Sequence, residues 1–258
     1  MRVGVIGKGG AGKSVIAGTI ARLAARGGAR VIAFDSDPVP GLSLSLGSGP
    51  EPAEPLLLGA TVQDQRGYWG WREGVDAVSA ALRFSTLAPD GVRLLQSGKV
   101  GRDGLGAIIG SSKAFVETTR GVADAAELRD WTFIGDLPAG PRQLAENWAP
   151  YARTYLVVVQ PSVQSALTAR RVAAIARQAP AGRSTLFIAN RVRGADDLRH
   201  IEDWLREPVF ASLPDDAELA GAERRGLAPI DHAPGSPAVA AMRRLVVALE
   251  RCSARPGA

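Results

Sequence analysis

The sequence contains one cysteine, Cys252, and two histidines among 258 residues. One thiol excludes an internal disulfide framework and any zinc or iron–sulfur site built from several cysteines of one chain. Two imidazoles leave little for a histidine-based metal site. No hydrophobic run approaches the length of a membrane span, and a core strand is expected from Arg2 onward, which predicts no signal peptide. We therefore expect a soluble, cytoplasmic protein with no membrane attachment.

Lysine is also scarce, because only four of the 31 basic residues are lysines and the other 27 are arginines. The net charge of +5 permits binding to nucleic acid or to an acidic partner without requiring it. Two of the four lysines, Lys8 and Lys13, lie in one short glycine-rich segment. Their placement indicates that this segment needs the compact ammonium group and not the planar guanidinium group.

The composition is adequate for a core, since 46% of the residues are hydrophobic, and the length suits one large α/β domain. Strand-like apolar segments alternate with segments of helical periodicity, which predicts a mostly parallel sheet with helices on both faces. We place this single domain at residues 1–252 and a frayed tail at 253–258. The expected strands are Arg2–Ile6, Arg30–Phe34, Val92–Gln96, Trp131–Gly135, Tyr155–Gln160, Ser184–Ala189 and Val209–Leu213. The expected helices are Ser14–Arg26, Gln143–Trp148, Ser165–Gln178, Asp196–Arg206, Asp216–Arg225 and Pro237–Arg251.

The segment after the second expected strand is less regular. Three prolines in six residues predict a long surface loop at 47–60, because proline suits neither a helix interior nor a central strand. Tyr68, Trp69 and Trp71 follow in a stretch that the pattern does not place. For these aromatic residues we favour buried packing over a partner-binding patch.

Residues 7–14 read GKGGAGKS and satisfy the pattern G-x-x-x-x-G-K-[ST] between an expected strand and an expected helix. Glycines let backbone N–H groups converge on phosphate oxygens, and the helix N-terminus adds positive charge. Lys13 is expected to reach the β- and γ-phosphates, and the Ser14 hydroxyl to ligate Mg²⁺. The segment predicts a nucleotide site formed by Gly7, Lys8, Gly9, Gly10, Ala11, Gly12, Lys13 and Ser14.

The position of Lys8 directly after the first glycine gives the form K-G-G-x-G-K-S. With this deviant Walker A loop the chain resembles the MinD/ParA/nitrogenase-iron-protein class of P-loop ATPases. The resemblance implies ATP and Mg²⁺ as cofactors and an α/β P-loop domain. It also implies an ATP-dependent homodimer, in which Lys8 contacts the phosphates bound to the partner subunit.

Two further segments resemble the switch regions of this class. Asp35-Ser36-Asp37-Pro38 is similar to switch I, which implies that Asp37 orients the attacking water and that Asp35 lies near Mg²⁺. Residues 133–140 resemble the Walker B strand and switch II, which implies that Asp136 holds a metal-bound water and that Gly140 offers its N–H to the γ-phosphate. The resemblance thus assigns catalysis to Lys8, Lys13 and Asp37, and the metal to Ser14, Asp35 and Asp136.

The adenine side of the expected site rests on two later segments. Residues 187–192 and 212–215 resemble the family's base-binding elements, with Asn190 bonding the base and Pro214 and Asp215 packing beside it. Taken without the rest of the pattern, Asn190 reads equally well as an ordinary residue at the end of a strand.

The C-terminal half resembles most the accessory ATPases that mature carbon monoxide dehydrogenase (CooC-like), at residues 158–162, 165–171, 190–193 and 215–226. Those proteins and the nitrogenase iron protein carry metal-binding cysteines in a middle segment, whereas residues 98–119 of this chain contain none. Cluster-dependent electron transfer is therefore not expected, and the usual ligands for nickel delivery are missing. We predict a dimeric switch ATPase that acts on a protein client as a maturation or accessory factor.

Three other readings stay open. In a ParA/MinD-like partition or positioning ATPase, arginines would bind DNA without sequence preference, but we favour a solvated arginine-rich surface. The last expected helix is amphipathic, which fits a membrane surface or, as we favour, core packing. A small-molecule kinase on the same fold would pass the phosphate to an acceptor other than water. The arginines concerned are Arg170, Arg171, Arg177, Arg224, Arg225, Arg243 and Arg244.

Overall fold

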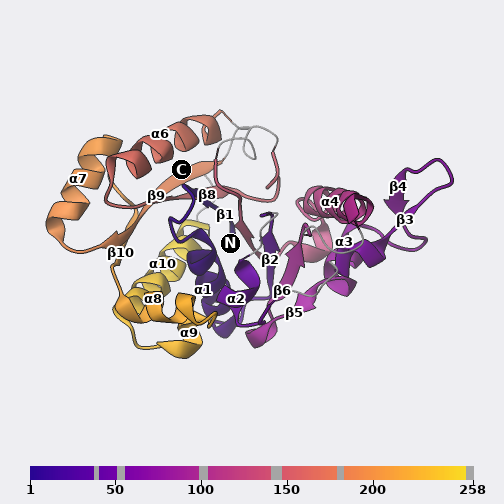
Figure 1. Cartoon of the computed structure of the whole chain (residues 1–258), viewed down its shortest axis with the longest axis horizontal. Helices are drawn as coiled ribbons and strands as arrows, with labels where there is room; N and C mark the ends of the chain where they lie inside the picture. The colour runs from indigo at the N-terminus through magenta and orange to yellow at the C-terminus, as the bar shows by residue number, and fades with distance from the viewer. Residues whose placement is uncertain (38–40, 51–55, 99–103, 141–146, 179–182, 254–258) are drawn as a thin grey trace.

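The computed structural model describes the chain except for residues 38–40, 51–55, 99–103, 141–146, 179–182 and 254–258. Its centre is an eight-stranded sheet with the order β10-β9-β8-β1-β7-β2-β6-β5 (Figure 1). Every pairing in this sheet is parallel except that of β5 with β6, so the expected mostly parallel α/β architecture is confirmed. The strands are β1 (Arg2–Gly7), β2 (Val31–Asp35), β5 (Thr86–Leu87), β6 (Arg93–Gln96), β7 (Thr132–Asp136), β8 (Thr154–Val159), β9 (Ser184–Val192) and β10 (Ala211–Pro214).

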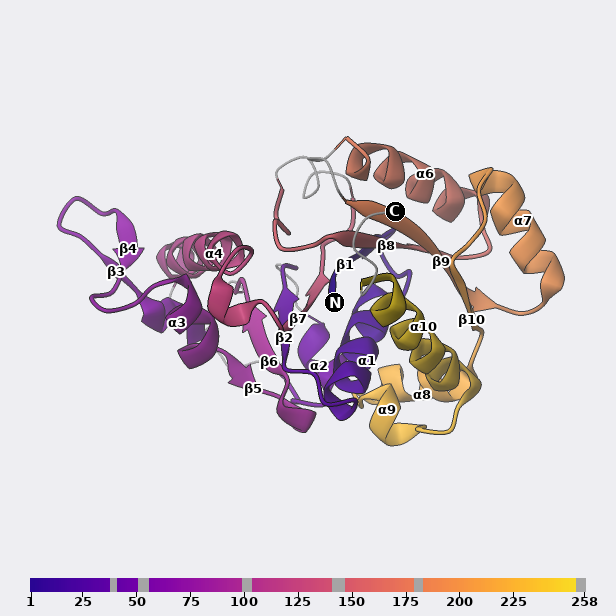
Figure 2. The same ribbon diagram turned by 180° about the vertical axis from the view of Figure 1, so that it is seen from behind.

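Helices cover both faces of the sheet (Figures 1 and 2). One face packs against α1, α2, α9 and α10, and the other against α3, α4, α6 and α7. The α-helices are α1 (Lys13–Arg26), α2 (Leu42–Leu46), α3 (Ala77–Arg83), α4 (Gly104–Gly121), α6 (Val163–Ala176), α7 (Ala195–Leu205), α8 (Ala217–Arg224), α9 (Pro229–His232) and α10 (Pro237–Ser253). Short 3-10 helices lie at η1 (Leu56–Ala60), η2 (Pro89–Gly91) and η3 (Ala126–Leu128).

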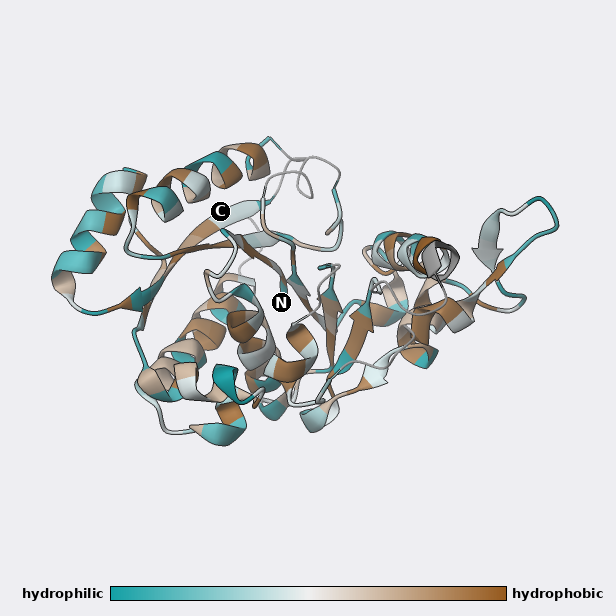
Figure 3. Ribbon diagram, viewed as in Figure 1, coloured by the Kyte–Doolittle hydropathy of each residue, from teal (hydrophilic) through white to brown (hydrophobic). Residues whose placement is uncertain are grey.

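The core follows the two-residue period of the strands. In β8, Leu156 and Val158 pack on the α1 face, whereas Tyr155 and Val157 pack on the α6 face. Figure 3 shows hydrophobic residues along the central strands, while α7 and the tip of the β3–β4 hairpin are hydrophilic. A sheet buried on both sides has continuous apolar strands, which is why the sequence pattern located these strands well.

The last helix belongs to the core. The apolar residues of α10 are buried against α1 and β10, which agrees with core packing and not with a membrane surface. Among the described residues, no helix combines the length and the apolar character that crossing a bilayer requires. The buried side chains are Val239, Met242, Leu245, Val246 and Leu249.

The segment between β2 and β6 differs from the expectation. Residues 51–55 lie outside the described part, but Leu56–Ala60 forms η1 with Leu57 and Ala60 buried, so the predicted surface loop at 47–60 is wrong at its C-terminal end. This turn lies against α4 and buries Leu57 in the core, a tertiary contact that the proline-rich local pattern does not reveal. The predicted helix Gln143–Trp148 falls mostly outside the described residues, and Asn147 and Trp148 are not helical.

A two-stranded antiparallel hairpin, β3 (Thr61–Gln63) and β4 (Trp69–Trp71), lies at one end of the molecule (Figures 1 and 2). Trp69 packs against Gly110 of α4, and Lys113 donates a hydrogen bond to the Trp69 carbonyl. Trp69 and Trp71 are half-buried, but Tyr68 is 70% exposed. The expectation of buried aromatics is therefore wrong for Tyr68, which sits in the turn where no neighbour covers it.

Candidate functional site

The chemistry-bearing residues meet at the carboxyl edge of the sheet, where open α/β sheets bind their ligands. The glycine-rich loop follows β1, Asp35 ends β2, and Asp136 ends β7. Because β7 lies between β1 and β2, Asp136 is in register with Val5 on one side and with Asp35 on the other. The strand order therefore brings together Asp35 and Asp136, which are 101 positions apart in the sequence.

The loop is shaped to expose backbone N–H groups. Gly10 and Gly12 have φ of 73° and 91°, in the left-handed region that favours glycine, and Ala11 is buried beneath them. Gly12 is the N-cap of α1 and no side chain caps this helix end. The first N–H groups of α1 are therefore free to face a ligand at the loop, and the positive end of the helix dipole lies there too. Both features favour binding of an anion.

Two amide side chains from other strands hold the loop in place. Gln160, directly after β8, donates from Nε2 to the Gly10 carbonyl at 3.2 Å, and Asn190 of β9 donates from Nδ2 to the Ala11 carbonyl at 2.8 Å. Sequence analysis missed Gln160. The available signal was its place at the end of a strand, because β8 pairs with β1 and so ends beside the loop.

Gly12 leaves no room for a side chain. A Cβ at this position would lie 2.5 Å from Asn190 Nδ2, and an alanine would also be strained at φ 91°. We expect Gly12→Ala to weaken ATP binding by about tenfold or more, because the strain and the displaced Asn190 both distort the loop. Titration calorimetry measures this, with Gly28→Ala, a positive-φ glycine that meets no neighbour, as the control for strain alone. An unchanged ATP affinity in Gly12→Ala would contradict the expectation.

The two lysines of the loop point in different directions. Lys13 is 8% exposed and its Nζ lies 3.5 Å from the Lys8 carbonyl oxygen, so its ammonium group stays over the loop. Lys8 instead extends outward, and its Nζ donates to Gln164 Oε1 at the start of α6 at 3.1 Å. One lysine is thus placed for the loop's own ligand, and the other reaches the protein surface.

The acids at the strand ends are buried. Asp35 and Asp136 are 0% and 1% exposed, and burial raises the pKa of Asp136 to about 6. A hydrogen bond from Ser14 and the charge of Lys13 oppose this rise in the pKa of Asp136. Burial and the neighbouring Asp136 also raise the pKa of Asp35 well above its usual value. Two buried carboxylates side by side are unfavourable without a cation to neutralise them.

This arrangement fits Mg²⁺. Asp136 Oδ1 is buried without a hydrogen-bond partner, while the same carboxylate accepts a bond from the Ser14 hydroxyl. In the described part of the chain no three His, Cys, Asp or Glu side chains form a metal-binding group by themselves. Such a site suits Mg²⁺, which takes most of its ligands from phosphates and water.

The segment that follows β2 is tied to Asp35. Its Oδ1 accepts from the Asp37 N–H at 3.2 Å and its Oδ2 accepts from the Leu42 N–H at 3.1 Å. Both Asp35 oxygens therefore hold this segment, whereas Asp136 Oδ1 has no hydrogen-bond partner. The charge of Asp37 lies close enough to raise the pKa of both Asp35 and Asp136. Pro38 lies outside the described residues, and Gly140 has φ 104° with open space around its Cα.

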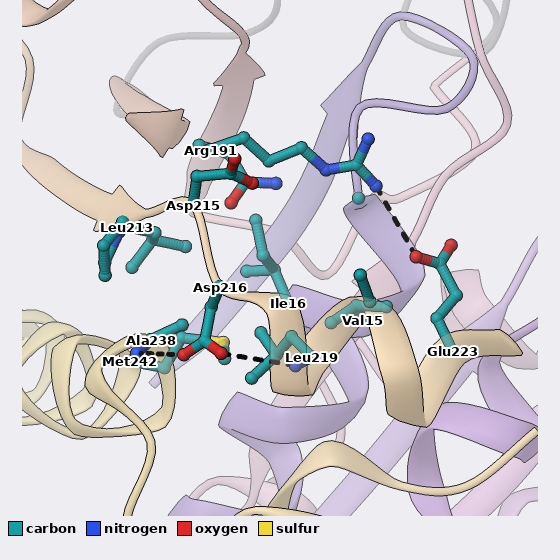
Figure 4. A pocket seen from close by; sticks show the side chains of 14 residues that line it. Val15, Ile16, Arg191, Leu213, Asp215, Asp216, Leu219, Glu223, Ala238 and Met242 are labelled. Carbon is teal, nitrogen blue, oxygen red and sulfur yellow. Dashed lines mark hydrogen bonds and ion pairs between the residues drawn. The ribbon is translucent and has the colours of Figure 1, made fainter. Parts of the chain in front are cut away.

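A pocket opens beside Gly12 at the ends of β9 and β10 (Figure 4). Asn190, Pro214 and Asp215, which the sequence analysis assigned to the base, all line it. Its other lining comes from α1, α8 and α10 and from further residues of β9 and β10, none of which the sequence pattern assigned. These additional lining residues are Val15, Ile16, Arg191, Leu213, Asp216, Leu219, Ala220, Glu223, Ala238 and Met242.

With this geometry in hand, comparisons with known proteins define the class. A family model described as the CobQ/CobB/MinD/ParA nucleotide binding domain matches residues 4–230, and the chain belongs to this family. It is a P-loop ATPase. Two structurally similar proteins, MinD of Pyrococcus horikoshii and cobyrinic acid a,c-diamide synthase of Mycobacterium smegmatis, contain Mg-ADP and an ATP analogue with magnesium, respectively.

The chain is also similar to individual proteins of known sequence or structure. The chain is 27% identical over 247 residues to the carbon monoxide dehydrogenase accessory protein CooC of Rhodospirillum rubrum, covering 91% of each chain. Its fold is similar to that of a ParA family ATPase from Chlorobium tepidum, with a TM-score of 0.72, 17% identity and coverage of 96% and 98%. It is also similar to MinD of Pyrococcus horikoshii in complex with Mg-ADP, with a TM-score of 0.66, 18% identity and coverage of 98% and 96%.

Proposed function

We propose that the protein is a Mg²⁺-ATP-dependent switch that dimerises with ATP bound and acts on a protein client, as a maturation or accessory factor. The observation that carries the proposal is the outward direction of Lys8. Its ammonium group bonds Gln164 on the surface of α6 and not its own loop, where Lys13 lies. A second lysine that faces outward at a phosphate loop is suited to the phosphates of a second subunit.

The residues at the strand ends account for hydrolysis and release. ATP binds with its phosphates on residues 7–14, and Asp37 orients a water that attacks the γ-phosphorus while ADP leaves. Ser14 and Asp136, with Asp35 close by, would hold Mg²⁺, which would supply positive charge beside the phosphates. Loss of the γ-phosphate removes the partner of Gly140 and of the segment that Asp35 anchors. Switch I and switch II then relax, and the dimer opens.

The proposed client is a protein, following the likeness to CooC over nearly the whole chain. Cys252, the one cysteine, is exposed near the end of α10, so a dimer would offer two thiols in total. We therefore propose no metal as cargo.

The DNA-binding alternative would need one arginine-rich face. The arginines considered for it are all exposed, but those of α6 lie on the opposite side of the sheet from those of α8 and α10 (Figures 1 and 2). Arg177 is moreover paired with Glu207 at 2.5 Å. Because these arginines lie on opposite sides of the sheet, they form no single DNA-binding face on one protomer, which supports the interpretation that they are ordinary solvated surface residues. DNA retention that requires ATP and falls steeply with salt would favour the alternative instead.

The test is the solution mass of Asp37→Ala by light scattering, with Mg²⁺-ATP and then with Mg²⁺-ADP. We expect a dimer with ATP and a monomer with ADP, because this variant binds ATP and hydrolyses it poorly. The double variant Lys8→Ala/Asp37→Ala should bind ATP with similar affinity and remain a monomer. A mass of Asp37→Ala that does not depend on the nucleotide would contradict the proposed nucleotide-dependent dimerisation. Full ATPase activity of Asp37→Ala would contradict the catalytic role of Asp37.

A further inference from the structure

The pocket beside Gly12 combines an apolar surface with polar and charged side chains. Val15, Ile16, Leu213, Leu219 and Met242 supply the apolar surface, and the polar and charged lining residues are Asn190, Arg191, Asp215, Asp216 and Glu223. One of these acids, Asp216, already has hydrogen-bond partners. Asp216 caps α8 by accepting from the Glu218 and Leu219 N–H groups, and it also accepts from the Ala238 N–H of α10. The apolar part of this lining suits the face of a flat ring next to the glycine-rich loop.

Arg191 lies across this pocket. Its backbone has φ 59°, an uncommon left-handed conformation for a residue that is not glycine. Figure 4 shows its side chain extended above Val15 and Ile16, with the guanidinium group directed at Glu223. The Arg191–Glu223 ion pair has an N–O distance of 3.5 Å, and its side chains are 45% and 53% exposed. An ion pair this exposed contributes little to the stability of the fold. The fold therefore gains little from holding Arg191 in its left-handed backbone conformation.

We propose that Arg191 binds the nucleotide by stacking its guanidinium group on the purine ring, and that Glu223 positions it. The proposal rests on the nucleotide site of the proposed function. A guanidinium group is planar and weakly hydrated, and it stacks on aromatic faces while its edge keeps hydrogen bonds. The purine is then held between Arg191 on one face and the apolar surface of the pocket on the other.

The two consecutive residues Asn190 and Arg191 divide the recognition of the base. Asn190 Nδ2 is engaged by the Ala11 carbonyl, which leaves its Oδ1 to accept from the exocyclic amine at the edge of the ring. Arg191 covers the face of the ring. Glu223 lies on the pocket side of α8 with Asp216, Leu219 and Ala220, at the spacing of one helix face, and so keeps the guanidinium over the pocket.

The experiment compares two ligands, Mg²⁺-ATP and Mg²⁺-tripolyphosphate, by titration calorimetry. Tripolyphosphate reaches the loop but has no ring to stack on. We expect Arg191→Ala to weaken ATP binding by about 10-fold and to change tripolyphosphate binding less than twofold. Arg191→Lys keeps the charge and should still lose most of the affinity for ATP. Glu223→Gln should weaken ATP binding about threefold, because it loosens the guanidinium group without removing it.

Matched controls come from the same elements. Arg193 directly follows β9, two residues after Arg191, but it pairs with Asp197 and does not line the pocket. Glu218 lies on α8 outside the pocket lining. Arg193→Ala and Glu218→Gln should each leave both affinities within twofold of the wild type.

Each alternative result is decisive. Equal weakening of ATP and tripolyphosphate by Arg191→Ala would mean that Arg191 acts on phosphate charge, and would overturn the stacking proposal. Unchanged ATP affinity in Arg191→Ala, or full affinity in Arg191→Lys, would also overturn it. A wild-type protein that binds neither ligand would refute the nucleotide site itself, which is a separate failure.

Discussion

Replacement of Lys13 by alanine is expected to abolish nucleotide binding, with a loss of at least about 100-fold in the affinity for Mg²⁺-ATP. Lys13 is 8% exposed, and its Nζ stays 3.5 Å from the Lys8 carbonyl above the loop. Its charge also offsets part of the burial cost of Asp136, whose pKa it lowers. A γ-phosphate brought to the loop without this ammonium group would face the buried acids uncompensated.

The measurement is the dissociation constant for ATP by calorimetry, together with the thermal midpoint of the free protein. Lys113→Ala is the matched control, because Lys113 is another of the four lysines but lies on α4 and bonds the Trp69 carbonyl of β4, far along the chain from the loop. Lys113→Ala should bind ATP normally. Retention of affinity within about tenfold in Lys13→Ala would contradict the assignment of the phosphate site to this loop.

Replacement of Arg22 by methionine is expected to lower the free energy of unfolding by about 3 kcal/mol. Arg22 of α1 is 2% exposed and connects four segments, since it bonds Asp90, Asp231 at 2.8 Å and the Leu46 carbonyl at 2.7 Å. Its removal leaves the Leu46 carbonyl without this donor, and leaves Asp90 and Asp231 with Arg26 as their remaining partner. Because Asp231 is 47% exposed and regains water, the cost stays at the lower end for a broken buried pair.

Arg26 provides a matched control one turn further along α1. It bonds the same two carboxylates, Asp90 and Asp231, but it is 39% exposed. Arg26→Met should therefore cost less than about 1 kcal/mol. Urea denaturation of both variants gives the comparison. Equal losses for Arg22→Met and Arg26→Met would show that burial does not set the strength of this cluster.

The same cluster has a pH signature. The hydrogen bond from Arg22 holds the pKa of Asp231 below its usual value. A carboxyl group with a lowered folded-state pKa adds stability above its unfolded pKa of about 4 and loses it as the pH falls through the folded value. The stability difference between wild type and Arg22→Met should therefore shrink below about pH 4. A stability difference that stays constant from pH 7 to pH 3 would show that ionisation of Asp231 does not contribute to the stabilisation by Arg22.

The glycine-rich loop could be predicted from the sequence because its pattern lies within a few consecutive residues. Residues 7–14 form a contiguous segment in which left-handed backbone at Gly10 and Gly12 requires glycine. The strands β1, β2, β7 and β8 are buried on both faces, so their apolar runs stand out in the sequence. By contrast, η1 and the β3–β4 hairpin depend on contacts with α4, which no local pattern reveals.

The α/β class, the glycine-rich loop between β1 and α1 and the acids at the ends of β2 and β7 can be read from the sequence, because each depends on residues close together in the chain. Tertiary structure decided which acids meet, that Gln160 and Asn190 hold the loop, and that Lys8 faces outward while Lys13 does not. It also decided that Arg191 and Glu223, 32 residues apart, meet over one pocket. The physical reason is that strand order and helix packing set these distances, and both follow from burial of the whole core.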